Sequence, residues 1–175
     1  PAPYANEYYN AKGLKYACID LNEENHAFKI DLSKPFTGKI HLNDGSAYSP
    51  EGENEMLFDL ITDYGTSEHV GKDGKHNIEA YYNCWKTKYD LLKVGGVMIS
   101  ENPKTGNWPG HGFNYVDKNF YLRLCGFLGF DLITLEEHPA MGNTTDGWNV
   151  VCVFVKRRPD FITLEEFKTL GVKTS

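Results

Sequence analysis

The segment Met56–Val70, MLFDLITDYGTSEHV, restricts the possible folds more than any other part of this sequence. It begins with a short apolar run around one aspartate, which is typical of a buried β-strand. The apolar run stops at Thr62, and a carboxylate, an aromatic ring and a glycine follow directly in Asp63-Tyr64-Gly65. Ligands of open α/β sheets bind at the carboxyl ends of the strands. The segment therefore predicts a strand that ends in a ligand-facing loop, although a strand running into an ordinary turn would look the same.

The rest of the chain predicts an alternation of strands and helices. We expect helices over Ala5–Ala11, Asn77–Leu92, Asp117–Gly126 and Asp160–Leu170, and strands over Leu14–Leu21, Ala27–Ile30, Met56–Thr62, Val97–Ser100, Phe130–Leu135 and Asn149–Val155. The helix from Asn77 has apolar and aromatic residues at three- and four-residue spacing, and Gly95-Gly96 is expected to end it. Thr163 and Glu166 form a capping-box pattern in the last helix, and Thr37–Asn54 is predicted to be a loop.

This order of elements predicts an α/β fold with a mostly parallel sheet and helices on both faces. Leu14–Leu21, Met56–Thr62 and Val97–Ser100 should be neighbouring parallel strands. Phe130–Leu135 and Asn149–Val155 follow each other without a helix, so we expect them to pair antiparallel.

Size and charge limit the classes of protein and of partner. The chain has 175 residues, enough for a single domain over residues 1–175 with a core of its own. The net charge of −6 is spread over interspersed acids and bases, which argues against nucleic acid as a partner. No apolar run approaches the roughly 20 residues of a membrane span. The four cysteines lie in apolar surroundings without a CxxC pair, as is typical of reduced thiols in a cytoplasmic protein.

From about Leu14 to Lys156 the chain resembles the class I S-adenosylmethionine-dependent methyltransferases. The stretches that carry the resemblance are Tyr16–Asp20, Phe28–Leu32, Phe58–Val70 and Leu91–Ile99. The first three look like the second, third and fourth strands of that family, and the last looks like its LKPGG turn and fifth strand, with Val94 where proline is commoner. The resemblance implies a Rossmann-like methyltransferase fold that ends in an antiparallel hairpin.

The glycine-rich loop after the family's first strand has no counterpart in this sequence. In the family, backbone N–H groups of that loop hold the amino-acid part of the cofactor. We expect the chain to begin just after this loop, with Pro1–Tyr4 as its remnant and the first strand missing.

The resemblance also implies which residues bind S-adenosylmethionine and its methyl acceptor. Asp20 would accept hydrogen bonds from the ribose hydroxyls, the end of the following strand would face the adenine, and Tyr64 would stack near the adenosine. The expected cofactor-binding residues are Tyr4, Asp20, Leu21, Asp31, Leu32, Asp63, Tyr64 and Gly65. The expected substrate-binding residues are Glu68, Glu101, Trp108 and Tyr115. The acceptor would be a small molecule, a sugar or a lipid-linked glycan.

His69 and His111 are the candidates for the catalytic base, because histidine titrates near neutrality. His69 packed beneath its loop and His111 facing solvent are the plainer alternatives. A metal cluster of Asp63, Glu68, His69 and His76 has no spacing signature, so the sequence predicts no metal site.

The loop Glu101–Tyr115 has the composition of a functional loop, with glycines, prolines and aromatic residues. It should fold over the same sheet edge as Asp63 and Tyr64, with His111 facing the transferred methyl group. The alternative is a surface loop whose aromatic residues pack on the helix Asp117–Gly126.

Two other functions remain open at this point. One is a non-catalytic binding or structural module that retains the methyltransferase fold. The other is a nucleotide-binding α/β domain such as a dehydrogenase, which would also need a glycine-rich turn. The sequence does not define an oligomeric state.

Overall fold

The computed structural model describes residues 5–21, 27–48, 57–140 and 147–174. Its elements are α1 (Ala5–Ala11), β1 (Ile19–Asp20), β2 (Phe28–Lys29), β3 (Ile40–His41), β4 (Ala47–Tyr48), β5 (Phe58–Tyr64), the short 3₁₀ helix η2 (Ser67–His69), α2 (Ile78–Leu91), β6 (Leu92–Pro103), α3 (Lys118–Leu128), β7 (Asp131–Pro139), β8 (Trp148–Val155) and α4 (Leu164–Lys168). The fold is mixed α/β, as the sequence predicts.

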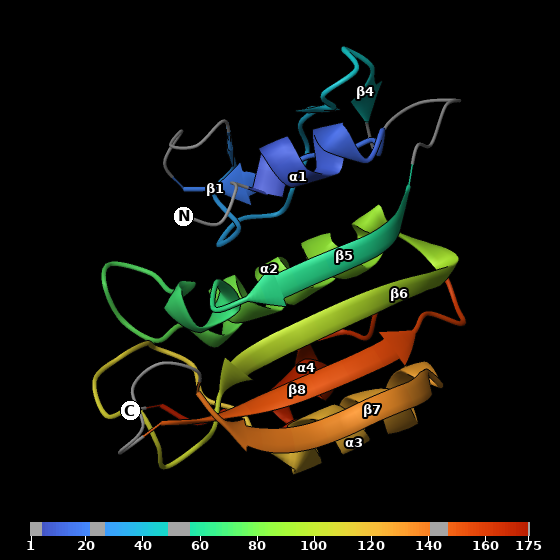
Figure 1. Ribbon diagram of the computed structural model, residues 1–175. Coiled ribbons are helices and arrows are strands. Elements are labelled where there is room, and N and C mark those ends of the chain that lie inside the picture. The colour runs from blue at the N-terminus through green and yellow to red at the C-terminus, as the bar shows by residue number, and fades with distance from the viewer. Residues whose placement is uncertain (1–4, 22–26, 49–56, 141–146, 175) are drawn as a thin grey trace.

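The main sheet has four strands in the order β5-β6-β8-β7, which Figure 1 shows as the lower part of the molecule. β5 runs parallel to β6, and Thr62 pairs with Ile99 at its centre. β6 pairs with β8, and β8 with β7, in antiparallel fashion. The expected β5–β6 neighbours and the expected antiparallel final pair are therefore confirmed. The four strands form a mixed sheet, with one parallel and two antiparallel pairings.

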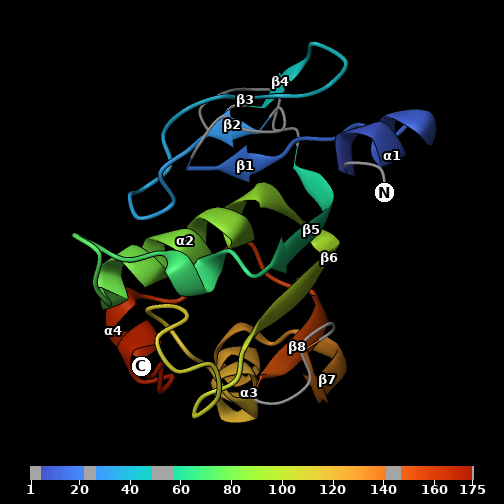
Figure 2. The same ribbon diagram turned by 60° about the vertical axis from the view of Figure 1, so that its left-hand side comes forward.

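The N-terminal strands form separate small sheets. β1 and β2 are parallel to each other, and β3 and β4 form an antiparallel hairpin. The predicted pairing of Leu14–Leu21 with the Met56 strand is not found among the described residues, where the strand is reduced to Ile19–Asp20. Instead, Ile19 and Phe28 pack beside β5 and against Leu91 of α2, so this region lies next to both elements (Figure 2).

The hairpin β3–β4 falls within Thr37–Asn54, which the sequence predicts to be a loop, so that prediction is wrong at this point. Asp44-Gly45-Ser46 forms its turn, with Gly45 at a φ of 82° and the Ser46 N–H donating to Asp44 Oδ1. Asn43 ties the hairpin back to the preceding segment, because its side chain accepts from the Tyr16 N–H and donates to the Leu14 carbonyl.

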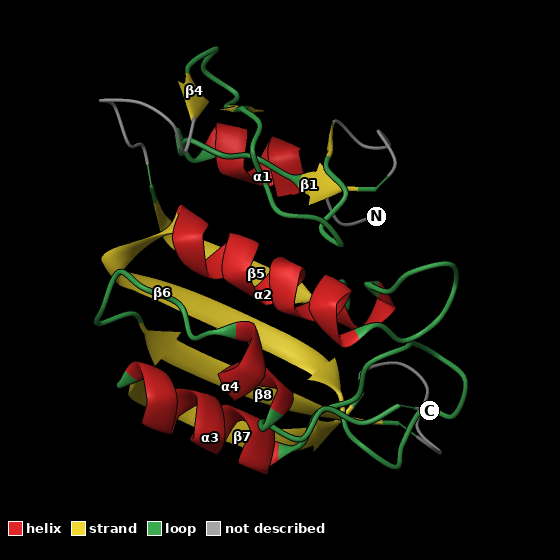
Figure 3. Ribbon diagram, turned by 180° about the vertical axis from the view of Figure 1, so that it is seen from behind, coloured by secondary structure: helices red, strands yellow, loops and turns green. Residues whose placement is uncertain are grey.

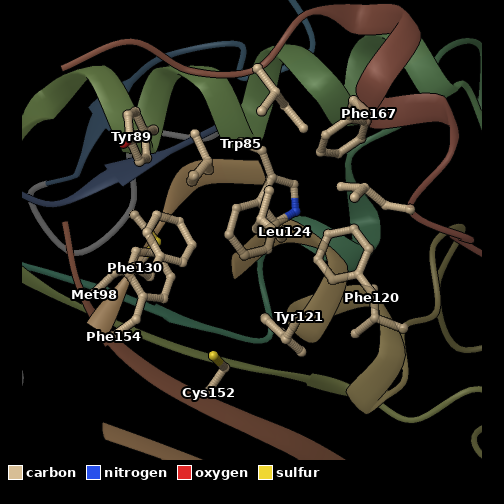
Figure 4. Packing of buried hydrophobic residues seen from close by; sticks show 14 of the residues in the cluster. Trp85, Tyr89, Met98, Phe120, Tyr121, Leu124, Phe130, Cys152, Phe154 and Phe167 are labelled. Carbon is tan, nitrogen blue, oxygen red and sulfur yellow. The ribbon is translucent and has the colours of Figure 1, made fainter. Parts of the chain in front are cut away.

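One face of the four-stranded sheet is covered by α2, α3 and α4 (Figure 3). Met98 and Phe154 point to that side and join a core of aromatic and aliphatic residues that includes Trp85 and Phe120 (Figure 4). The other face carries no helix over β6, β8 and β7 in Figure 1. The expected cover on both faces is therefore found on one face of this sheet within the described part of the chain.

Local capping fixes α2 and α3 close to their predicted starts, whereas α4 spans only Leu164–Lys168 of the predicted Asp160–Leu170. The Asn77 side chain accepts from the Ala80 N–H at 2.9 Å, and Asp117 accepts from the Phe120 N–H at 3.0 Å. Thr163 and Glu166 form the predicted capping box of α4. α3 continues past the predicted end at Gly126 and stops at Gly129, whose φ of 62° is typical of a helix C-terminus.

The Gly95-Gly96 pair does not end α2, contrary to the prediction. α2 ends at Leu91 and the chain passes directly into β6, so both glycines belong to the strand. Gly95 has a φ of 88°, and a Cβ on Gly96 would lie 2.8 Å from Leu92 Cδ1 and 3.1 Å from the Asp59 carbonyl oxygen. The glycines therefore allow a sharp change of direction and a close approach to β5.

The sequence argues against a membrane-spanning segment and against disulfide bonds, and the structure bears on both points. No helix in the described ranges has the length and apolar character that crossing a membrane requires. All four cysteines are free thiols, as predicted.

Candidate functional site

The carboxyl end of β5 sends neighbouring side chains to opposite faces of the sheet. Asp63 is buried on the helix side, whereas Tyr64 is 60% exposed on the open side. Gly65 then turns the chain with a φ of 74°, and its N–H donates to the Glu101 carbonyl of β6. The Asp63-Tyr64-Gly65 sequence therefore ends the strand at the predicted edge, but its two functional side chains do not face the same space.

Asp63 forms a buried ion pair with Lys88 of α2, with 2.5 Å between Oδ2 and Nζ. The same carboxylate accepts hydrogen bonds from the backbone N–H groups of Thr66 and Ser67, and the Ser67 hydroxyl lies 2.6 Å away. Burial opposes both charges, but the Lys88 ammonium outweighs it, so the pKa of Asp63 is lowered. Both carboxylate oxygens are engaged inside the protein, and this geometry gives Asp63 a structural role rather than the expected contact with a cofactor.

The loop after β6 folds onto the loop after β5, as the sequence predicts. The Glu68 carbonyl accepts from the backbone N–H groups of Phe113 at 2.7 Å and Asn114 at 3.1 Å. The Asn114 side chain donates to the Val70 carbonyl at 2.7 Å. A Cβ on Gly112 would lie 3.0 Å from Glu68 Cγ, so the glycine permits the close approach of the two loops. Glu68 is thus fixed by residues far along the chain.

Glu68, His69 and His111 come together where these two loops meet. Glu68 Oε1 lies 3.7 Å from His69 Nε2 and 3.8 Å from His111 Nε2. The Glu68 side chain is only 2% exposed, and its Oε2 has no hydrogen-bond partner. Burial, followed by the negative charge of Asp63, raises the pKa of Glu68 to about 7. Burial and the neighbouring His111 lower the pKa of His69. The predicted catalytic histidines therefore share one buried carboxyl group.

Two predicted substrate residues hold His111 in place. The Tyr115 hydroxyl accepts from the backbone N–H groups of His111 and Gly112 and donates to the Trp108 carbonyl at 2.6 Å. The Trp108 ring lies 5.0 Å from the His111 ring, and its backbone has a φ of 59°, which is unusual for a tryptophan. Tyr115 is itself buried. Tyr115 therefore fixes the backbone of the loop. Trp108 forms one side of the group of Glu68, His69 and His111, which is called the histidine site below.

Glu101 lies on the open face of the sheet beside Tyr64, its register partner on β5. Its Oε1 accepts a hydrogen bond from Asn149 at 2.7 Å and lies 3.4 Å from His138 Nε2. Burial, Glu101 and Tyr9 of α1 together raise the pKa of Tyr64. Glu101 and Tyr64 therefore form a pair of polar side chains at the carboxyl end of β5. This pair lies on the face of the sheet opposite to Asp63.

The remaining predicted cofactor residues belong to the β1–β2 region. Asp20 ends β1 and accepts from the Leu21 N–H, and Leu21 is 65% exposed. Asp31 follows β2 and accepts from the Ser33 hydroxyl, and the pKa of Asp31 is lowered by Lys34 and then by Ser33. Leu32 is half-buried in the same turn. β1 and β2 are parallel, so the two acids lie at the same edge of that pair. Tyr4 lies outside the described residues.

Several residues of the site escaped the sequence analysis. Lys88 had a detectable signal, because it lies on the same predicted helical face as Trp85 and Tyr81, where a lysine needs a partner. His111 was predicted, but its meeting with Glu68 depends on how the two loops pack. Asn114 and Asn149 carried no signal in the sequence. His76, considered for a metal cluster, bonds instead with Asn114 at 2.8 Å.

The chain was compared with protein families, with curated proteins and with solved structures. No protein-family model, no curated protein and no solved structure matches the chain.

Proposed function

We propose that this chain is the catalytic domain of an S-adenosylmethionine-dependent methyltransferase that acts on a small-molecule, sugar or lipid-linked acceptor. The observation that supports the proposal is the strand arrangement. A parallel pair, β5–β6, is extended by two antiparallel strands, and a separate parallel pair, β1–β2, is followed by acids. The resemblance implies both of these groups of strands, whereas the expected direct pairing of β1 with β5 is not found among the described residues.

The acids at the ends of β1 and β2 suit the nucleoside part of such a cofactor. A ribose offers two adjacent hydroxyl groups, and an ionised carboxylate can accept a hydrogen bond from each. Asp20 is the proposed acceptor, since it stands at the carboxyl end of β1. The exposed ring of Tyr64 offers a surface on which a flat base can stack.

The histidine site supplies the chemistry on the acceptor side. Bound S-adenosylmethionine would supply a methyl group activated by its sulfonium sulfur, and an acceptor hydroxyl that takes up this methyl group would lose its proton. The proton of the acceptor hydroxyl passes to His69 or His111, which are each partly open to solvent. The Trp108 ring beside His111 restricts water on that side.

A titration calorimetry experiment with S-adenosylhomocysteine tests the proposal. We expect saturable binding by the wild-type protein, and weaker binding by Asp20→Asn. The loss of charge from an acceptor of two hydrogen bonds corresponds to about 1.5–3 kcal/mol per bond at most. Asp59→Asn is the matched control, because Asp59 is an exposed strand aspartate paired with Lys93. The control should bind as the wild type does.

Equal affinity in the wild type and Asp20→Asn would contradict this site assignment. The absence of any binding would favour a non-catalytic module with the same fold. One observation favours that second candidate: both carboxylate oxygens of Asp63 are bonded to protein groups in the interior.

A further inference from the structure

We propose that Glu68, His69 and His111 together bind one divalent transition-metal ion. One possible ligand atom from each residue lies within 4.8 Å of the others, and among the described residues these three form such a group. The proposal stands on the positions of these three side chains and does not rest on methyl transfer. In the metal-bound protein both imidazoles are ligands, so the proton acceptance proposed above belongs to the metal-free protein. It assigns a metal site that the sequence pattern does not predict.

The distances are close to those that a bound ion requires. With metal–ligand distances of about 2.0–2.2 Å, neighbouring ligand atoms around a tetrahedral ion lie roughly 3.3–3.6 Å apart. Glu68 Oε1 lies 3.7 Å from His69 Nε2 and 3.8 Å from His111 Nε2. The ligand nitrogens of the two imidazoles lie within 4.8 Å of each other, so ring movements of up to about one ångström would complete the geometry. These side chains are 48% and 42% exposed, so both rings have space to adjust.

Glu68 gives an independent reason to expect a cation. Its side chain is 98% removed from solvent, yet Oε2 has no hydrogen-bond partner, and Oε1 lies within 4 Å of both imidazoles. A buried carboxyl group without partners is costly, and proteins normally pair such groups or use them to coordinate metals. The nearby charges of Asp63 and Lys88 neutralise each other in their own ion pair. The Glu68 carboxyl group therefore lacks a positive partner that a bound ion would supply.

The ligand types select the class of metal. Two imidazoles and one carboxylate suit zinc, iron, cobalt and related ions, whereas magnesium and calcium prefer oxygen ligands alone. Three protein ligands leave at least one coordination position for water or for an oxygen of a substrate. The exposed sides of His69 and His111 provide the entry path.

The surrounding structure holds the three ligands in advance. The Glu68 backbone is bonded to Phe113 and Asn114, and the His111 backbone is bonded to Tyr115. A Cβ on Gly65 would lie 3.3 Å from Glu68 Oε1, so a bare glycine also leaves space beside the carboxyl group. Ligands on fixed backbone lose little entropy when an ion binds, which favours affinity.

Metal binding can be measured on the full chain after treatment with a chelator and dialysis. We expect one equivalent of Zn²⁺ by calorimetry, and one equivalent of Co²⁺ by its visible absorption, with no comparable binding of Mg²⁺. His69→Ala and His111→Ala should each weaken binding by about 100-fold or more, since loss of an outer-shell partner alone costs about 10–100-fold. His41→Ala is the matched control, an exposed histidine on the β3–β4 hairpin, and should bind as the wild type does.

Glu68→Gln keeps the size of the side chain and also should weaken binding, which guards against loss of fold in the alanine variants. Circular dichroism of each variant checks that it is folded. Absence of saturable Zn²⁺ and Co²⁺ binding in the wild type would overturn the proposal, as would unchanged binding in a folded His69→Ala/His111→Ala double variant. The calorimetry with S-adenosylhomocysteine is repeated in chelator, so a failure of the metal site and a failure of the proposed function give separate results.

Discussion

At the scale of single residues, the buried Asp63–Lys88 pair connects the site to the core. Asp63 belongs to β5 and Lys88 to α2, and the Lys88 ammonium also lies 3.9 Å from the centre of the Trp85 ring. Removing one partner of a buried pair leaves an uncompensated charge in a medium of low dielectric constant. The pair therefore fixes how the loop after β5 starts, and so where Glu68 and His69 are placed.

We predict that Asp63→Asn lowers the free energy of unfolding by about 3–5 kcal/mol, because Lys88 loses its counter-charge. The double variant Asp63→Asn/Lys88→Met should lose much less than the sum of the single variants. The exposed pair Asp59–Lys93, with 2.7 Å between its charged atoms, is the control, and its coupling should be below about 1 kcal/mol. Denaturant unfolding of each variant gives the coupling energies, and a similar value for the two pairs would contradict the structural role.

The same pair predicts a pH dependence. The pKa of Asp63 is lowered in the folded protein, with Lys88 outweighing the effect of burial, and the pKa of Lys88 is raised. Stability from a lowered carboxyl pKa is present above its unfolded value and is lost as the pH falls through the folded value. Below about pH 4 the wild type should therefore lose stability more steeply than Asp63→Asn. Unfolding midpoints measured from neutral to acidic pH test this, and parallel curves would count against it.

At the scale of elements, one hydroxyl group makes three of the hydrogen bonds inside the loop between β6 and α3. The Tyr115 hydroxyl forms hydrogen bonds with the backbone of His111, Gly112 and Trp108, and these bonds close one turn. The loop is then attached to η2 through Glu68. A segment rich in glycine and proline is thus given a single shape by tertiary hydrogen bonds.

Tyr115→Phe should lower the free energy of unfolding by about 1–3 kcal/mol, because the buried N–H of Gly112 loses its acceptor, while the His111 N–H keeps the Trp108 carbonyl. It should also weaken Co²⁺ binding roughly 10-fold, as expected of a residue that positions a ligand. Tyr82→Phe is the control, since its hydroxyl donates one hydrogen bond to the Ile162 carbonyl outside the site. The positioning role is wrong if both variants bind Co²⁺ as the wild type does.

Local patterns allowed the helices to be predicted from sequence, and long-range packing explains most of the differences. Asn77, Asp117 and the Thr163–Glu166 box act within one turn of chain, so their effect can be read directly. The role of Gly95-Gly96 depends on the approach of β5, and the partner of His111 depends on where two loops meet. Neither contact is encoded by neighbouring residues.

At the scale of the whole molecule, the described helices cover one face of the main sheet and leave the other face open over β6, β8 and β7 (Figure 1 and Figure 3). Met98 and Phe154 point to the helices, whereas their neighbours Ile99 and Val153 point to the other side. Covered faces on both sides are the rule for fully parallel sheets, but antiparallel strands can leave one face to water. The prediction of two covered faces failed because β8 and β7 run antiparallel to their neighbours.

This arrangement predicts unequal costs for neighbouring substitutions on β6. Met98→Ala removes a fully buried side chain and should cost about 2–5 kcal/mol. Ile99→Ala, on the open face, should cost less than half as much, because Ile99 is only partly buried. Thermal and denaturant unfolding of the two variants measure the difference. Equal costs would mean that the open face is covered in solution.

The most direct test of the proposed cofactor site is a titration of isotope-labelled protein with S-adenosylhomocysteine, followed by amide chemical shifts in nuclear magnetic resonance spectra. The site predicts that the largest shifts fall at Asp20, Asp31 and Tyr64-Gly65, at the carboxyl ends of β1, β2 and β5. Val94, at the opposite end of the main sheet, should not move. Shifts centred on Val94, or no shifts at saturating ligand, would contradict the assignment of this edge as the cofactor site.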